Sequence, residues 1–213
     1  MSSYEIRFVR SDQPGFHYQD DQVSVSAHGL SHRIPSYAYR FVEKTQSTQL
    51  NQALLVKYGV PRGELWGQLQ QGKAVTLEDG QIVQPDRVKL PAPSPRIAVI
   101  GGDNDQPGLL LEALKGAHIL VHEATMTQEV WDKGGSVWMH SSAKMVAEAA
   151  EQSGVPNLVL THFSGRYRLS PDAGDASVEV LREEARGYYS GHIALAEDLK
   201  SWVLNREGDF TAQ

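Results

Sequence analysis

From residue 96 onward, short apolar segments typical of strands alternate with segments typical of helices. The strands are expected at "RIAVIGG" (96–102), "HILVHEA" (118–124) and "NLVLTHF" (157–163). Helices are expected from Pro107 to about Lys115, from a Ser141 or Ser142 cap to Gly154, and over 176–189, with strand-like pieces over 192–204. Parallel neighbouring strands need a crossover, which a helix usually provides. The pattern therefore predicts an α/β fold with parallel strands.

The first half of the chain has a different pattern. Strands are expected at 4–9, 23–28 and 37–43, where the residues are β-rich. Residues 50–73 mix short helical periodicity with glycine and proline, which indicates an excursion rather than core. A hairpin with Asp79-Gly80 at its turn is expected at 74–83, followed by a proline-rich connector at 88–96.

Composition limits the class of protein. At 213 residues one domain is the natural expectation, and the absence of cysteine excludes disulfides, thiolate metal sites and a cysteine nucleophile. A net charge of −6 argues against broad electrostatic binding of nucleic acid, although a local basic patch remains allowed. No apolar run has the length of a bilayer span and no signal peptide is evident, so a cytoplasmic location is expected.

Three consecutive predicted strands end in polar, titratable residues. Asp103 follows the first strand, His122 and Glu123 end the second, and His162 ends the third. Because the carboxyl ends of parallel strands meet at one edge of a sheet, we expect these groups to converge.

Two further histidines are candidates, and the loop position of His140 could bring it over the same edge. His140 precedes a predicted helix, and His32 follows a strand of the first half. A single strand-end aspartate such as Asp103 is more often a cap or turn residue. Chance, however, rarely places a whole set at one level, here Asp103, His122, Glu123, His140 and His162. The other histidines are expected to be structural or exposed: His17, His28, His118 and His192.

Without cysteine, any metal in this protein must be held by His, Asp or Glu. Imidazole and carboxylate suit zinc or manganese, and a carboxylate can bridge two cations. A bridged pair of metals activates water at neutral pH and stabilises in-line displacement at phosphorus.

Seven stretches resemble, in order and spacing, the ribonuclease Z branch of the metallo-β-lactamase superfamily, whose members are tRNA 3′-processing endonucleases. They are "SHRIPSYAYRF", "PRGELWGQL", "VTLEDGQIV", "IGGDNDQP", "LVHEATMTQEV", "HSSA" and "LVLTHFSGRY". The succession of "HEAT", "HSSA" and "THFSGRY" is the most specific part. The resemblance implies the later, incomplete part of an αββα sandwich, as a single partial domain over 1–213. Residues 50–73 then match an exosite arm that grips the tRNA elbow.

The resemblance also implies roles for individual residues. His32 would bind one zinc ion, His162 the other, and Asp103 would bridge the two. His140 would donate a proton to the leaving 3′-oxygen, with Glu123 as its relay partner.

Further residues are placed around this site by the same resemblance. Ser164 and Arg166 fall where the family contacts substrate phosphate, and His122 and Thr125 are expected to support the site. Residues 50–73 carry three basic residues and one acidic residue, a net charge of 3 − 1 = +2.

The sequence departs from the family pattern. It contains no His-x-His, so the His-x-His-x-Asp-His motif is missing, and "GGDND" replaces the commoner "SGDT". We therefore expect at most one weakly held zinc ion where the family holds two, and no activity of the isolated chain. The expected partners are a tRNA precursor, and either a second copy of the chain or a missing N-terminal half.

Two alternatives to this function stay open. The chain could hydrolyse another phosphodiester or an ester at the same metal site, or it could be a non-catalytic truncated homologue that binds RNA or a partner subunit. An in-frame His-x-His-x-Asp-His encoded immediately upstream would favour the first, enzymatic hypothesis.

Overall fold

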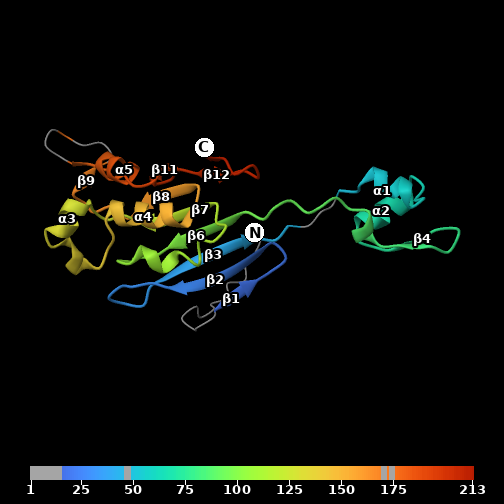
Figure 1. Cartoon of the computed structure of the whole chain (residues 1–213), viewed down its shortest axis with the longest axis horizontal. Coiled ribbons are helices and arrows are strands. Elements are labelled where there is room, and N and C mark those ends of the chain that lie inside the picture. The colour runs from blue at the N-terminus through green and yellow to red at the C-terminus, as the bar shows by residue number, and fades with distance from the viewer. Residues whose placement is uncertain (1–15, 46–48, 169–171, 173–175) are drawn as a thin grey trace, which may run out of the picture. The chain divides into compact units, whose positions relative to one another are not determined.

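The computed structural model describes residues 16–45, 49–168, 172 and 176–213. The strand expected at 4–9 lies outside these residues. The described residues form two compact units (Figure 1). The larger unit contains the residues up to Glu43 together with Arg96–Gln213, and the smaller unit contains Lys44–Pro95.

The larger unit is built on a seven-stranded mixed sheet with the order β1-β2-β3-β6-β7-β8-β11. Its strands are His17–Gln19 (β1), Val23–Gly29 (β2), Tyr37–Glu43 (β3), Ile97–Gly101 (β6), Ile119–Glu123 (β7), Asn157–Thr161 (β8) and His192–Leu195 (β11). Neighbours from β1 to β6 are antiparallel, and neighbours from β6 to β11 are parallel. The predicted α/β fold is confirmed, and its parallel strands are β6, β7, β8 and β11 of this mixed sheet.

Two helices pack against one face of the sheet, α4 (Ala143–Ser153) and α5 (Glu179–Arg186). The Ser142 side chain accepts a hydrogen bond from Met145 N, so it caps the amino end of α4. Gly154 ends the helix with a φ of 70°, a conformation that glycine adopts without a steric cost. Helix, sheet and connecting segments share one apolar core, whose fully buried members include Val146, Ala150, Leu120, Leu158, Leu160 and Leu181.

The remaining elements of this unit are short. They are η2 (Pro107–Leu110), α3 (Gln128–Asp132), η3 (Gly135–Trp138), β9 (Tyr167–Arg168) and β10 (Ala176–Ser177). The helix expected over 107–115 is therefore only a 3-10 turn, followed by further turns up to Gly116. Gly108 inside this segment has a low helix propensity, which favours a short turn over a regular α-helix.

The second face of the sheet is partly covered by the C-terminal hairpin of β12 (Trp202–Leu204) and β13 (Phe210–Ala212). Trp202, Leu204 and Phe210 of this hairpin pack against a cluster formed by Ile119, Val159 and Ala194. The sheet thus has apolar residues on both faces, as expected for parallel strands that are buried on both sides.

The smaller unit has its own apolar core. It contains α1 (Gln52–Lys57), α2 (Glu64–Gln70), β4 (Val75–Thr76), β5 (Ile82–Val83) and η1 (Pro85–Arg87). Its buried residues are Leu55, Val60, Leu69, Val75, Val83 and Val88. The hairpin predicted at 74–83 is confirmed by the antiparallel pairing of β4 and β5. The arm-like role expected for residues 50–73 stays a prediction.

Among the described residues, no helix combines the length and the apolar character that crossing a bilayer requires.

Candidate metal and acid–base site

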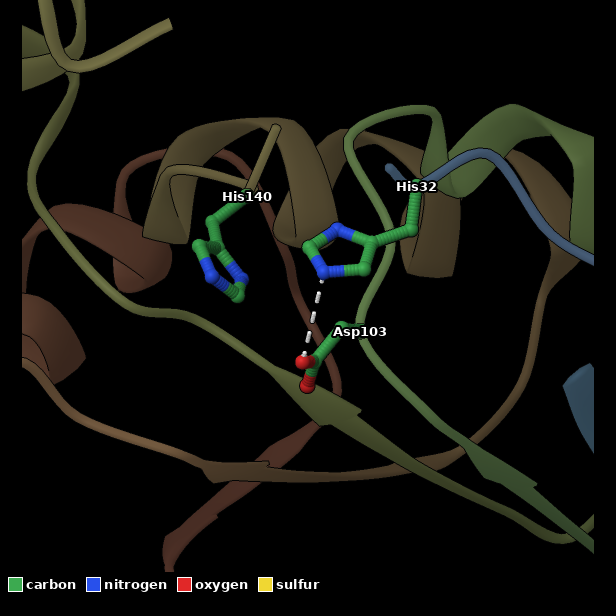
Figure 2. A group of neighbouring side chains, drawn as sticks. All are labelled: His32, Asp103 and His140. Atoms are coloured by element: carbon green, nitrogen blue, oxygen red, sulfur yellow. Dashed lines mark ion pairs between the residues drawn. The ribbon is translucent and has the colours of Figure 1, made fainter. Parts of the chain in front are cut away.

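The candidate site lies at the carboxyl ends of the parallel strands. Asp103 follows β6, Glu123 ends β7, and His162 follows β8. The β2–β3 loop reaches the same edge, because Ala38 at the start of β3 pairs with Gly101 at the end of β6. This loop carries His32, and Figure 2 shows its imidazole pointing at the Asp103 carboxylate, with His140 beside it.

The carboxylate of Asp103 lies between two histidines. Its Oδ2 is 3.7 Å from His32 Nε2, and its Oδ1 is 3.6 Å from His162 Nε2. Each oxygen therefore faces a nitrogen of a different imidazole. A carboxylate that bridges two cations needs this arrangement, with one oxygen for each ion.

The other ring nitrogens of these two histidines are engaged by the protein. His32 Nδ1 lies 2.9 Å from the Met139 carbonyl oxygen, so it must carry the hydrogen and donate it. His162 Nδ1 lies 3.0 Å from Thr125 Oγ1, which itself donates to Glu123 Oε2 at 2.8 Å. We assign the Nδ1–H tautomer to both rings on these contacts, which leaves both Nε2 lone pairs free for a cation.

Two residues of the site have left-handed backbone conformations. Met139 and His162 both have a φ of 56°. Non-glycine residues rarely adopt this region, and such strain concentrates at functional sites. At Met139 the conformation accompanies the carbonyl contact that orients His32.

Glu123 is buried, with 1% of its surface exposed, and its carboxylate is held from several sides. Oε2 accepts hydrogen bonds from Thr125 N at 3.0 Å and from Thr125 Oγ1. Oε1 accepts them from Ser141 N at 2.7 Å and from Asn104 N at 3.4 Å. His140 Nδ1 lies 3.3 Å from Oε1. This buried nitrogen has no hydrogen-bond partner among the described residues, because the contact to Oε1 is poorly aligned.

The His140 ring lies between the rings of His32 and His162. Its centroid is 5.1 Å from that of His32 and 5.0 Å from that of His162. The structure thus brings together all the residues that the sequence singled out for metal and proton chemistry.

His122 is fully buried, and its ring is used by the protein itself. Nδ1 lies 2.6 Å from the Glu123 carbonyl oxygen, and Nε2 lies 3.0 Å from Asn104 Nδ2. Burial lowers the pKa of His122, so the neutral ring is favoured. His122 therefore donates from Nδ1 and accepts at Nε2, in contacts that leave neither nitrogen for a ligand.

Ser164 and Arg166 lie on the segment that follows His162. Arg166 Nε donates to Ser164 Oγ at 3.3 Å, and Ser164 N donates to the Thr125 carbonyl at 3.0 Å. Ser164 is thereby tied to the residue that also contacts His162 Nδ1. Their expected contact with a substrate phosphate stays a prediction.

Asn104 was not singled out from the sequence, although it is fully buried and bonded to several parts of the site. Its position directly after Asp103 at a strand end was the available signal. Asparagine is common in turns, so its identity alone does not distinguish a loop residue from a site residue.

The donor atoms of the site fit a metal ion. Among the residues that the structure describes, two sets have ligand atoms that all lie within 4.8 Å of one another: His32, Asp103 and His140, and Glu123, His140 and His162. The donors are imidazole nitrogens and carboxylate oxygens, which suit zinc or manganese. His140 belongs to both sets, so its geometry allows either a ligand or an acid–base role.

No family model matches the chain, but it is similar in sequence to known ribonucleases Z. Ribonuclease Z of Marinobacter nauticus is 43% identical over 206 residues, which cover 96% of this chain and 63% of that protein. Ribonuclease Z of Brevibacillus brevis is 39% identical over 207 residues, which cover 95% of this chain and 62% of that protein. The chain thus spans about three fifths of the length of these relatives.

A solved structure agrees on the fold. The metallo-β-lactamase fold protein YhfI from Bacillus subtilis superposes with a TM-score of 0.52 at 15% identity, over 94% of this chain and 54% of that chain. The chain has a metallo-β-lactamase-type α/β architecture over about half the length of that protein. On the sequence identity that extends over nearly its whole length, the chain is a homologue of the ribonucleases Z over about three fifths of their length.

Proposed function

We propose that this chain carries the metal-binding and proton-donating part of a zinc-dependent endoribonuclease of the ribonuclease Z type, which processes tRNA precursors at their 3′ ends. The observation that supports this most directly is the Asp103 carboxylate, whose two oxygens face Nε2 of His32 and Nε2 of His162. The reaction class is that of the relatives, which are ribonucleases Z.

In this proposal His32, Asp103 and His162 are the metal ligands. When bound, zinc would supply positive charge next to the scissile phosphate and lower the pKa of a coordinated water molecule. The hydrogen bonds at the two Nδ1 atoms hold the rings so that Nε2 of each faces the carboxylate. Such contacts fix ring orientation and ligand basicity before any metal arrives.

His140 is the proposed proton donor to the leaving 3′-oxygen. An alkoxide departs poorly unless it is protonated as the bond to phosphorus breaks. Glu123 Oε1 lies 3.3 Å from His140 Nδ1, so a small rotation of the ring would let Nδ1–H donate to that oxygen. The carboxylate would then orient the ring through Nδ1–H, with Nε2 as the atom that delivers the proton to the leaving oxygen.

The described ligands do not complete a two-metal site. Zinc usually has four ligands, and a bridged pair sharing Asp103 receives only one further histidine per ion here. Apart from the two residues proposed for proton transfer, the described residues supply no further ligand for such a pair, and we propose that additional ligands come from polypeptide outside this chain and that the chain alone is therefore inactive. Ser164 and Arg166 would contact the substrate phosphate, and the net charge of +2 on residues 50–73 would favour RNA.

The proposal is tested by separating metal binding from turnover. The chain is co-expressed with the N-terminal segment of the Marinobacter nauticus relative. Two quantities are measured for each variant: its zinc content and its cleavage of a tRNA precursor that carries a 3′ trailer. Asp103→Ala should lose zinc and cleavage together. His140→Ala should keep its zinc and lower turnover by about 10²–10⁴-fold. His192→Ala, on β11 in contact with Phe210, is the matched control and should change neither.

The outcomes distinguish the assignments. Unchanged turnover of His140→Ala at full zinc occupancy would remove His140 from the mechanism. Loss of zinc from His140→Ala would make His140 a ligand, which its position in both donor sets allows. Cleavage of a simple phosphodiester but not of the tRNA precursor would leave the metal site in place and refute the proposed substrate.

A further inference from the structure

Asn104 forms hydrogen bonds with residues that are sequence neighbours of His32, Glu123 and His140 in the candidate site. It follows Asp103 directly in the sequence. Its side chain accepts from Ser31 N, next to His32, and donates to His122, next to Glu123. These contacts join the β2–β3 loop, the segment after β6 and the end of β7.

The main chain of Asn104 extends this set of contacts to the loop before α4. Its carbonyl oxygen accepts a hydrogen bond from Ser141 Oγ at 2.5 Å, and Ser141 is next to His140. The neighbouring residues reinforce the link to the β2–β3 loop. Asp105 N donates to the Ser31 carbonyl at 3.1 Å, and Gln106 Nε2 donates to Ser31 Oγ at 3.1 Å.

The side chain of Asn104 satisfies requirements that few residues combine. Its Oδ1 accepts two backbone hydrogen bonds, from Ser31 N and Gln106 N, both at 3.2 Å. Its Nδ2 donates to His122 Nε2 at 3.0 Å, in a site with no exposure to solvent. An aspartate offers no donor when ionised, and leucine offers neither group. An amide provides a donor and an acceptor at the reach that these partners require.

We infer that Asn104 is the positioning residue of the site: it sets the distance of His32 and His140 from Asp103 by holding Ser31 and Ser141 on either side of the carboxylate. Its backbone N donates to Glu123 Oε1 at 3.4 Å, and its side chain bonds to Ser31, Gln106 and His122 rather than to a metal ligand. This inference rests on one part of the proposed function, the assignment of His32, Asp103 and His162 as metal ligands. Residues that orient metal ligands in this way typically contribute 10–100-fold to metal affinity.

The test compares Asn104→Leu with Asn157→Leu. Asn157 is a second buried asparagine, 5% exposed, whose Nδ2 donates to the His118 carbonyl at 2.8 Å. It begins β8, so it lies at the amino end of the parallel strands, away from the site. Both substitutions remove a buried amide of the same size, so both should lower stability by a similar amount. Thermal unfolding measures this loss. Asn104→Thr is the conservative variant, because a hydroxyl group can both donate and accept.

Two measurements are made on the full chain. Co²⁺ is titrated into each variant and followed by its visible absorption, and the tautomer of His32 in the metal-free protein is read from ¹⁵N chemical shifts at one fixed pH. Asn104→Leu should bind Co²⁺ about 10–100-fold more weakly than the wild-type chain and lose the Nδ1–H preference of His32. Asn157→Leu should match the wild-type chain in both, and Asn104→Thr should recover part of each.

Equal Co²⁺ affinity and an unchanged His32 tautomer in folded Asn104→Leu would overturn the inference. Equal losses in Asn104→Leu and Asn157→Leu would also overturn it, because the effect would then be general destabilisation. If the wild-type chain binds no Co²⁺, the proposed ligand set fails, and the tautomer measurement alone decides the role of Asn104.

Discussion

The ion cluster around Glu43 should make the stability of the larger unit depend on pH. Glu43 ends β3 and receives hydrogen bonds from two arginines. Arg96 donates from Nε at 3.0 Å and from Nη2 at 2.9 Å, and Arg206 donates from Nη2 at 2.8 Å. Arg96 also donates to the Leu204 carbonyl at 2.8 Å, so the cluster connects β3, β6 and the C-terminal hairpin.

The magnitude follows from the pKa of Glu43. Its hydrogen bonds with Arg96, together with the charges of Arg96 and Arg206, lower that pKa from 4.5 to about 2. Without solvent screening, a shift of this size corresponds to about 3 kcal/mol of folding free energy. The Arg96 and Arg206 side chains are 38% and 47% exposed, so solvent screening reduces the contribution to about 1–2 kcal/mol.

The direction of the pH dependence follows from the sign of the shift. Because the pKa is lower in the folded state, the contribution is fully present above pH 4.5 and is lost as the pH falls toward about 2. Glu43→Gln should therefore lower the free energy of unfolding by about 1–2 kcal/mol at pH 7 and by progressively less below pH 4.5.

The assay is urea unfolding followed by circular dichroism at several pH values. Glu129→Gln is the control, since Glu129 pairs with Lys133 on the exposed surface of α3 and should leave the unfolding midpoint unchanged. A difference between Glu43→Gln and the wild-type chain that is the same at pH 7 and pH 3 would refute the electrostatic explanation. No difference at pH 7 would show that screening removes the contribution entirely.

Two further predictions concern metal content and association. The chain alone should bind at most one weakly held zinc ion, measured by elemental analysis after dialysis, and two tightly bound ions per chain would contradict the ligand count. The chain should also associate at high concentration. Ile100 lies on the same sheet face as Ala98, which packs in the cluster with the C-terminal hairpin, yet Ile100 itself is 43% exposed. Light scattering that shows a monodisperse monomer would argue against an exposed docking face.

Hydrophobic pattern and the chemistry of strand ends were sufficient to predict much of this protein. The strands at 96–102, 118–124 and 157–163 were predicted within two residues of their observed ends. Their parallel order then placed Asp103, Glu123 and His162 at one edge. These features are local or follow from the crossover that parallel strands require, so one sequence is enough to predict them.

Other features depended on contacts between distant segments. The adjacent residues His122 and Glu123 look equivalent in sequence, because both are titratable groups at a strand end. In the structure the His122 ring is hydrogen-bonded to Asn104 and to the Glu123 carbonyl, whereas the Glu123 carboxylate lies near His140. The sequence also did not indicate that residues 50–73 share a core with segments as far as Val88.

The roles of Asn104 and Met139 were decided only by the tertiary structure. Each acts through hydrogen bonds to residues far away in sequence: Asn104 to Ser31, and the Met139 carbonyl to His32. Such partners are set by how the β2–β3 loop and the loop before α4 pack at the edge of the sheet. Residue identity and periodicity determine which groups reach that edge, whereas packing determines which atoms face one another there.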